Sequence, residues 1–222
     1  MKPTKEYNGR SRIRMFNMDC MDFMKQVDKP YDLAIVDPPY MDNIDEYMGM
    51  QKRMGGVAKT KVYENVENFS KPNEIYFGML KILSDNQIIW GVNHYETYFG
   101  CGRIIWDKNV SGVYNDAELA YHSFSNAVKI YEFTWNGMLQ GNMKNKEHRI
   151  HPTQKPVQLY KWLLTNYAKQ GDTILDTHGG SMSIAIACWD LGFDLDIIEL
   201  DEDYFNDAVK RFENHISQTQ LF

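Results

Sequence analysis

Residues 33–40 read Leu-Ala-Ile-Val-Asp-Pro-Pro-Tyr. The first four have the length and the β-branched content of a buried parallel strand. The two prolines lack an N–H and fix φ, so the strand must end at Asp37 and the chain must leave it through a stiff turn. This places a carboxylate, two backbone carbonyls and an aromatic ring at the carboxyl end of a strand, where open α/β sheets bind their ligands. Taken alone, residues 37–40 are equally consistent with a proline turn that carries a surface tyrosine.

The C-terminal third of the chain has the order strand, glycine-containing loop, helix, strand ending in an acid, helix. We expect the two strands over 173–176 and 193–199 and the two helices over 183–191 and 202–215. This order is that of a Rossmann-type half. The sequence therefore predicts an α/β fold that is Rossmann-like, with a mostly parallel central sheet and helices on both faces.

The remaining apolar patterns predict the other elements. Strands are expected over 13–18, 87–91, 103–108, 116–121 and 128–135, and helices over 21–26, 72–83 and 157–168. Asp19 is placed to cap the first of these helices. Residues 1–12 are polar and are expected to form a loose arm. Residues 41–70 and 136–150 are polar, lack a clean period and are expected to be insertions.

Composition describes an ordinary globular chain. The 222 residues, 43% of them hydrophobic, are enough for one α/β domain over 1–222 with a full core. The apolar runs are far too short to span a bilayer, and no signal-like stretch follows the N-terminus. The three cysteines are widely spaced and form no C-x-x-C pair, which argues against a zinc site and a disulfide frame. We expect a cytoplasmic protein without a membrane segment or a metal.

The net charge of −6 is unusual for a protein that binds nucleic acid, but the distribution of charge matters more than its sum. Basic side chains gather in the two polar insertions. The first group is Lys52, Arg53, Lys59 and Lys61, and the second is Lys144, Lys146 and Arg149. Each group is also typical of a solvated loop, so charge alone does not decide between the two interpretations.

The glycine-containing loop carries Gly179 and Gly180 and is flanked by acids. Glycines let the backbone approach a ligand closely, and in dinucleotide-binding proteins such a turn receives a pyrophosphate. Asp176 and Asp201 would repel a pyrophosphate and would suit a cation, such as the sulfonium and ammonium groups of S-adenosylmethionine. Glu199, at the end of the next strand, stands where a ribose-binding carboxylate belongs, although a strand-end acid can also be merely exposed.

Residues 151–157 read His-Pro-Thr-Gln-Lys-Pro-Val and join the two parts of the chain. With Asp-Pro-Pro-Tyr first and the acid-flanked glycine loop last, the chain resembles the β-class of S-adenosylmethionine-dependent DNA amino-methyltransferases, the N6-adenine/N4-cytosine family. The similarity covers residues 13–213, and three motifs in the order of that class are a specific signal. It implies the methyltransferase variant of the Rossmann-like fold, S-adenosylmethionine as cofactor and DNA as partner.

The resemblance also implies roles for individual residues. Asp37 would accept a hydrogen bond from the target amino group, the Pro38 carbonyl would accept its second hydrogen, and Tyr40, with Pro39 beside it, would stack on the base. The implied cofactor-binding residues are Asp19, Cys20, Asp37, His151, Thr153, Lys155, Asp176, His178, Gly179, Gly180, Ser181, Glu199, Leu200 and Asp201. Both groups of basic residues would contact DNA phosphates, which position the duplex without reading its sequence.

Three positions depart from the usual pattern of the family. Thr177 and His178 stand where most members have a proline and a phenylalanine. Met182 stands where many members have the last glycine of the loop. A side chain at Met182 is expected to crowd the methionine end of the cofactor.

These residues suit methyl transfer to an exocyclic amine. The lone pair of such an amine is delocalised into the base, and two acceptors that hold both hydrogens favour a pyramidal nitrogen whose lone pair can attack. The chain has no Pro-Cys setting of the kind that carbon-5 cytosine methylation needs. A target inside a duplex must be flipped out.

We therefore expect a site-specific DNA methyltransferase that acts on adenine N6, because cytosine-N4 enzymes more often carry serine in place of Asp37. The alternatives are an N4-cytosine enzyme and a catalytically weakened relative that binds DNA. Related enzymes are often dimers, so a homodimer is a further expectation. The recognition sequence stays open, as does the choice between a restriction-modification, orphan or phage role.

Overall fold

The computed structural model describes residues 1–40, 71–110, 115–136, 139–151 and 153–219. The strands of its large sheet are β1 (Lys5–Asn8), β2 (Arg12–Asn17), β3 (Tyr31–Val36), β4 (Ser84–Trp90), β5 (Arg103–Asp107), β6 (Ala117–His122), β7 (Val128–Glu132), β10 (Thr173–Asp176) and β11 (Asp194–Glu199). A separate hairpin consists of β8 (Trp135–Asn136) and β9 (Leu139–Gln140). The helices are α1 (Cys20–Met24), α3 (Glu74–Leu83), α4 (Val157–Tyr167), α5 (Ser183–Leu191) and α6 (Glu202–Thr219), with a 3-10 turn η1 (Val92–His94).

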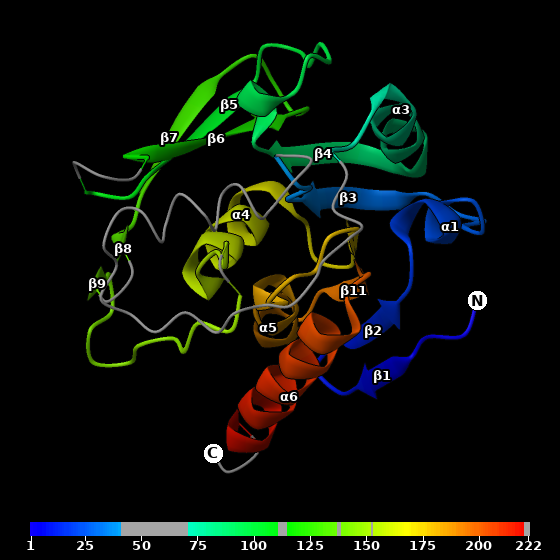
Figure 1. The fold of residues 1–222 in the computed structure, drawn as a ribbon, viewed down its shortest axis with the longest axis vertical. Helices are drawn as coiled ribbons and strands as arrows, with labels where there is room; N and C mark the ends of the chain where they lie inside the picture. The colour runs from blue at the N-terminus through cyan, green and yellow to red at the C-terminus, as the bar shows by residue number, and fades with distance from the viewer. Residues whose placement is uncertain (41–70, 111–114, 137–138, 152, 220–222) are drawn as a thin grey trace.

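The strands of the large sheet lie in the order β1-β2-β11-β10-β3-β4-β6-β5-β7 (Figure 1). Every neighbouring pair from β2 to β4 is parallel, and so are β5 and β7. β1 is antiparallel to β2, and β6 runs antiparallel between β4 and β5. The predicted Rossmann-like α/β class with a mostly parallel sheet is confirmed.

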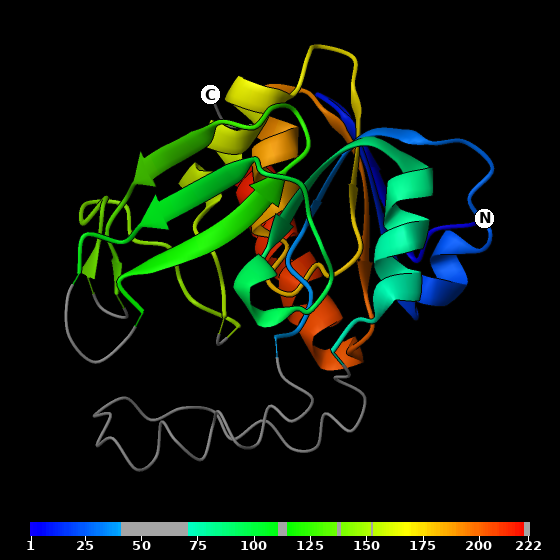
Figure 2. The same ribbon diagram turned by 90° about the horizontal axis from the view of Figure 1, so that it is seen from above.

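Helices cover both faces of this sheet, as predicted (Figure 2). Alternate residues of a strand point to opposite faces, so Leu33 and Ile35 enter one core, which α4, α5 and α6 complete, whereas Ala34 and Val36 enter the other, which α1 and α3 complete. All four side chains are almost fully buried. The apolar run 33–36 is thus continuous because β3 is covered on both sides.

The structure corrects two predictions about individual elements. Residues 1–12 do not form a loose arm, because β1 pairs with β2 in the register Lys5 to Met15 through Asn8 to Arg12 and so becomes the edge strand. The strand expected over 128–135 is divided into β7 and the start of the β8–β9 hairpin. The cap expected for the first helix is confirmed, since the Asp19 carboxylate accepts a hydrogen bond from the Asp22 N–H at 3.0 Å.

The topology brings the ends of several strands to one edge of the sheet. β10, β3 and β4 are parallel neighbours, so their carboxyl ends meet there and present Asp176, Asp37 and Gly91 in that order. β6 runs the opposite way, so it starts at this edge, with Glu118 near its beginning. In the part of the chain that the structure describes, no helix is long and apolar enough to cross a membrane.

Candidate active site

The motif 37–40 leaves β3 at the edge just described, and its polar groups are engaged. The Tyr40 hydroxyl donates a hydrogen bond to Asp37 Oδ1 at 2.5 Å. Pro38 is buried, and its carbonyl accepts a hydrogen bond from the Tyr95 hydroxyl at 2.8 Å. The Pro39 carbonyl lies 3.3 Å from the same hydroxyl. Because a carbonyl oxygen has two lone pairs, Tyr95 orients Pro38 and still leaves it able to accept a second hydrogen bond.

The ring of Tyr40 has a seat built by the segment after β4. It stacks on the imidazole of His94 with a centroid distance of 4.7 Å and an interplanar angle of 7°. Gly91 has a positive φ of 70°, and a Cβ added there would lie 2.0 Å from Cε1 of Tyr40. Gly91 therefore serves both the left-handed backbone and the close approach of the Tyr40 ring.

Lys155 lies two positions before the start of α4 and contacts the same motif. Lys155 is only 4% exposed. Its ammonium donates hydrogen bonds to Asp37 Oδ2 and, at 3.2 Å, to the Tyr40 hydroxyl. It also lies 3.0 Å from Glu118 Oε2, and the other oxygen of Glu118 is 2.6 Å from the ammonium of Lys108. Two lysines and two carboxylates thus form one chain of ion pairs that ends at Asp37.

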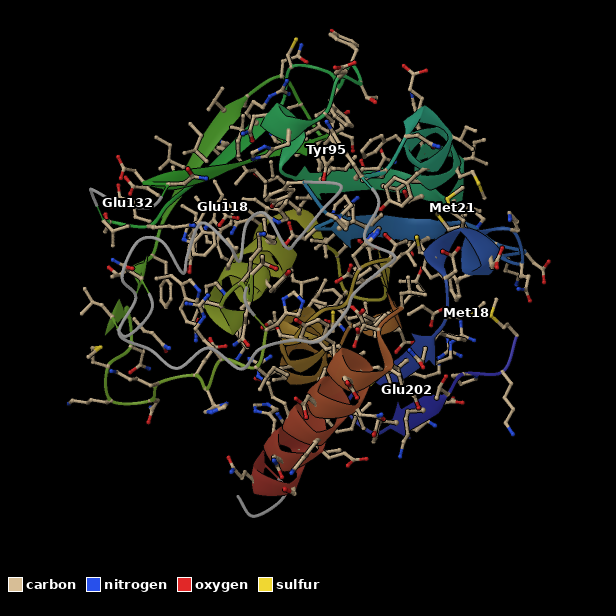
Figure 3. The ribbon with its side chains drawn as sticks, viewed as in Figure 1. Met18, Met21, Tyr95, Glu118, Glu132 and Glu202 are labelled. Atoms are coloured by element: carbon tan, nitrogen blue, oxygen red, sulfur yellow. The ribbon has the colours of Figure 1, made fainter. Side chains whose placement is uncertain are left out.

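The charges in this chain shift one another's pKa values. Burial alone lowers the pKa of Lys155, but the carboxylates of Asp37 and Glu118 outweigh burial and raise it. Burial alone raises the pKa of Glu118, but the two lysines outweigh burial and lower it to about 2. Lys155 is therefore an ammonium and Glu118 a carboxylate at neutral pH. Figure 3 shows Glu118 and Tyr95 beside the β4–β6 part of the sheet.

Asp176 ends β10 and is the most deeply buried of the acids around the glycine-containing loop. It is 1% exposed, and its Oδ1 accepts a hydrogen bond from the His178 N–H at 3.0 Å. Among the described residues it has no salt bridge. Burial is the main cause that raises its pKa, to about 8, and the nearby carboxylates of Asp37 and Glu199 add to it.

Glu199 at the end of β11 is held by two backbone N–H groups. One oxygen accepts from Gly180 at 2.6 Å and the other accepts from Asp201 at 2.9 Å. The Asp201 side chain in turn accepts from the Tyr204 N–H at 2.8 Å and so caps α6. Gly180 has a positive φ of 49°. The loop is thus fastened to the end of β11, and the acids predicted for this region lie together.

The expectation that Met182 crowds a ligand is not what the structure indicates. Its side chain is fully buried among the apolar residues beneath α4, α5 and α6. The departure from glycine is visible in the backbone instead, because Met182 has a φ of 53° in the left-handed region. Its N–H donates to the Gly179 carbonyl at 2.7 Å.

The other predicted cofactor residues lie on either side of this loop. Cys20 Sγ is 3.9 Å from Nε2 of His178, and the ring of His178 is 2.9 Å from Oγ1 of Thr177, which contacts the Tyr76 hydroxyl at 2.6 Å. Burial lowers the pKa of His178 to about 3, so its imidazole is neutral. Leu200 differs from these residues because it is 45% exposed.

His151 and Ser181 close the other side. The imidazole of His151 packs edge to face on Tyr204 with a centroid distance of 4.3 Å, and Nδ1 lies 3.1 Å from Oγ1 of Thr153. Burial lowers the pKa of His151 to about 3, and the neighbouring Lys155 and Arg149 add to this effect. The Ser181 carbonyl accepts a hydrogen bond from Arg211 at 2.8 Å. A second nitrogen of Arg211 contacts Glu147 at 2.7 Å.

Of the two predicted basic groups, the structure describes only the second. Lys144 and Lys146 are exposed, and the guanidinium of Arg149 lies 5.8 Å from the centre of the Trp135 ring. Glu147, in the middle of this group, is turned inward to Arg211 and to the first N–H of α4. The first basic group, Lys52, Arg53, Lys59 and Lys61, and the rest of the insertion 41–70 lie outside the described residues. DNA contacts by either group stay a prediction.

Sequence reasoning missed several residues of this arrangement. Glu118 and Lys108 complete the ion-pair chain, Tyr95 orients the Pro38 carbonyl, and Gly91 makes room for Tyr40. The signal for Gly91 was present, since glycine directly follows an apolar strand as in other ligand-binding turns. Glu118 gave no such signal because it lies at the beginning, and not at the end, of its strand.

Comparison with known proteins gives concordant results. Residues 106–210 match the DNA methylase family of N6 and N4 methyltransferases. The chain is 23% identical over 252 aligned positions to the type II methyltransferase M2.DpnII of Streptococcus pneumoniae, covering 95% of this chain and 93% of that protein. It is 22% identical to the type II methyltransferase M2.MboI of Moraxella bovis, covering 84% and 82%.

Solved structures share the fold. The complex of M1.HpyAVI with S-adenosylmethionine superposes with a TM-score of 0.54 at 21% identity and covers 90% of this chain and 99% of its own. The cytosine-N4-specific PvuII DNA methyltransferase superposes with a TM-score of 0.54 at 12% identity and covers 97% and 92%. Similarity therefore extends over almost the whole chain.

Proposed function

Because the chain belongs to the family of N6-adenine and N4-cytosine DNA amino-methyltransferases, we propose that it transfers a methyl group from S-adenosylmethionine to adenine N6 in DNA. The observation that carries the proposal is the position of Asp37 and the Pro38 carbonyl, side by side with the acid-flanked glycine loop at one sheet edge. Two acceptors for an amino group and a set of acids for a cationic cofactor are thus neighbours.

The residues of the loop fit S-adenosylmethionine, the cofactor of this family. When bound, it supplies a methyl group made electrophilic by a sulfonium. Asp176 is buried and has no salt bridge among the described residues. A cationic group nearby would therefore lower its raised pKa and favour the carboxylate. Glu199, preoriented by the N–H groups of Gly180 and Asp201, keeps free lone pairs that can accept from ribose hydroxyls. Asp176, Glu199, Gly180 and Asp201 are therefore the residues that would hold the cofactor.

The groups of the 37–40 motif would act on the target amine. Asp37 accepts one amino hydrogen and the second lone pair of the Pro38 carbonyl accepts the other, which favours a pyramidal nitrogen with a directed lone pair. The charge of Asp37 also stabilises the positive charge that develops on that nitrogen. Tyr40, backed on one face by His94, offers its other face to the base.

The DNA would reach this site as a flipped nucleotide, because an amine inside a duplex is out of reach. Phosphate contacts are assigned to Lys144, Lys146 and Arg149 in the described part of the chain and to the basic residues of 41–70 beyond it. These contacts would give affinity that falls steeply with salt.

Adenine is preferred over cytosine because the motif begins with Asp37 and not with serine. The similarity to the cytosine-N4-specific PvuII enzyme keeps N4-cytosine methylation as the second candidate. Both reactions use the same two acceptors, so the fold does not separate them. A catalytically weakened DNA-binding relative is the third candidate.

Incubation of the protein with labelled S-adenosylmethionine and DNA, followed by nucleoside analysis, tests the proposal. Label in N6-methyladenine is the expected result, and label in N4-methylcytosine would replace adenine by cytosine. Label in neither nucleoside, with DNA binding retained, would overturn the enzymatic proposal. Sequencing of modified bases in the product DNA then identifies the recognition sequence.

A further inference from the structure

Lys155 stands between two carboxylates that come from different strands. Its ammonium donates to Asp37 Oδ2, after β3, and lies 3.0 Å from Glu118 Oε2, on β6. Both carboxylates are within reach of one side-chain terminus, so the ammonium can serve either without entering water. A buried ammonium requires such a partner at all times.

The backbone that carries Lys155 is fixed, so exchange between the two partners needs movement of the side chain alone. The carbonyl of Gln154 accepts from the Trp135 indole at 2.9 Å, and its side-chain oxygen accepts from the Ile150 N–H at 3.0 Å. Pro156 follows at the start of α4, where its carbonyl accepts a hydrogen bond from the Leu159 N–H at 3.1 Å. The Lys155 ammonium lies 5.4 Å from the centre of the buried Trp90 ring.

Glu118 is arranged as an underused acceptor. Lys108 anchors it through Oε1 at 2.6 Å. Oε2 is buried and forms an ion pair with the Lys155 ammonium at 3.0 Å, and among the described residues no other donor is recorded for it. The carboxylate therefore has an oxygen ready for a stronger contact with Lys155.

The proposed reaction creates a need for this second partner. Asp37 must accept a hydrogen from the target amine, and because its oxygens already accept from Tyr40 and Lys155, the amine would have to share Oδ2 with the ammonium. An ammonium that stayed on Asp37 would also repel the positive charge that develops on the amine nitrogen. Withdrawal of Lys155 from Asp37 removes this repulsion and leaves Oδ2 to the amine alone.

We propose that Glu118 and Lys155 are positioning residues for methyl transfer: Lys155 holds Asp37 in place before the base arrives and then moves its ammonium to Glu118, which frees Asp37 Oδ2 for the amine. Lys108 keeps Glu118 in position for this exchange. This inference rests on the proposed function, and it assigns to Lys155 a role toward Asp37 that is separate from cofactor binding.

The test compares single-turnover methyl transfer at saturating S-adenosylmethionine and DNA. Glu118→Gln keeps the shape of the side chain but removes the alternative carboxylate, so Lys155 stays on Asp37 and the transfer rate falls about tenfold or more. The dissociation constant for S-adenosylmethionine, measured by calorimetry, stays at the wild-type value. Glu132→Gln, which removes one charge from the exposed edge strand β7, is the matched control and keeps the wild-type rate.

A double variant separates exchange from simple support. If Lys155 inhibits once Glu118 is gone, adding Lys155→Met to Glu118→Gln raises the rate above that of Glu118→Gln alone. A wild-type rate for Glu118→Gln, or a double variant no faster than Glu118→Gln, would overturn the inference. A wild-type protein that methylates no DNA would instead overturn the proposed function.

A structure of the wild-type protein with S-adenosylhomocysteine and target DNA decides the matter if Glu118→Gln does not fold. The expected arrangement has the Lys155 ammonium hydrogen-bonded to Glu118 Oε2 and out of hydrogen-bond distance of Asp37 Oδ2. An ammonium that still donates to Asp37 with the target base in place would contradict the exchange.

Discussion

The two halves of the carboxyl edge contain carboxylates in opposite electrostatic settings. Asp176, on β10, is buried without a salt bridge among the described residues, and burial raises its pKa to about 8. Glu118, on β6, lies between the ammonium groups of Lys108 and Lys155, which lower its pKa to about 2. The surroundings thus destabilise the ionised carboxylate of Asp176 and stabilise that of Glu118.

The difference indicates what each half is prepared to receive. The half around Asp176 and Glu199 has an excess of acceptors and gains most from a ligand that brings positive charge. The half around Asp37 already contains its cations, so its charges act on one another and control when Asp37 is available. Substitutions in the first half should therefore change cofactor binding, and those in the second should change methyl transfer.

The largest effect is expected from Asp37→Ala. The variant loses the acceptor and the charge that act on the amine, so methyl transfer falls by about 1,000-fold or more. S-adenosylmethionine binding largely survives, because Asp37 belongs to the other half. Calorimetry and a single-turnover assay measure the two quantities, with the exposed Asp28→Ala as control. Transfer at the wild-type rate would show that another carboxylate is catalytic.

Gly91→Ala tests the seat of Tyr40. The added Cβ would lie 2.0 Å from the Tyr40 ring, and the residue has a positive φ, so the ring must move. We expect transfer to fall by roughly 100-fold, because a small displacement of a positioning group has a large effect on rate, with cofactor affinity unchanged. Gly78→Ala, on α3 with nothing within 4 Å of the new Cβ, is the matched control. Equal activity of both variants would show that methyl transfer does not depend on Gly91 to position the Tyr40 ring.

Asp176→Asn tests the first half through stability as well as binding. The unfolded carboxyl loses its proton near pH 4, whereas the folded one keeps its proton up to about pH 8. Between these values the folded state binds more protons, so the free energy of unfolding falls as the pH rises. Asparagine does not titrate, so in the Asp176→Asn variant the free energy of unfolding no longer falls for this reason as the pH rises.

The Asp176→Asn variant should therefore be more stable than the wild type at pH 8, by up to about 5 kcal/mol, and similar at pH 4. It should also bind S-adenosylmethionine more weakly, since the carboxylate available to a cation is lost. Urea unfolding at the two pH values and calorimetry measure both effects. A variant less stable than the wild type at pH 8 would show that the folded protein stabilises Asp176 as a carboxylate, so that its pKa is not raised.

The smallest effect is expected at Met182, which follows the glycine-containing loop and is buried in the apolar core. Met182→Ala removes a buried side chain and should lower the free energy of unfolding by about 2–5 kcal/mol. Met182→Gly removes the same side chain but relieves the left-handed backbone, so it should be about 1 kcal/mol more stable than the alanine variant. Cofactor affinity that rises in both variants would restore the view that Met182 crowds the ligand.

Much of the arrangement could be read from local sequence because its elements are local. Residues 33–40 predict a strand and a stop, since prolines cannot continue a sheet, and 173–201 predict two strands and a glycine turn. The N-terminal strand β1 was missed because its residues are mostly polar and, apart from the half-buried Tyr7, exposed on both faces. An edge strand of this kind lacks the hydrophobic alternation on which the prediction depends.

By itself, the sequence determined the class of the sheet, the resemblance to DNA amino-methyltransferases, and the position of Asp37, Asp176 and Glu199 at strand ends, because a parallel strand brings its carboxyl end to the ligand edge wherever it lies. Only the tertiary structure decided that Glu118 joins them. It does so because β6 is inserted antiparallel beside β4, so its beginning meets their ends. The same packing set Lys155 between Glu118 and Asp37, a contact that no spacing in the chain encodes.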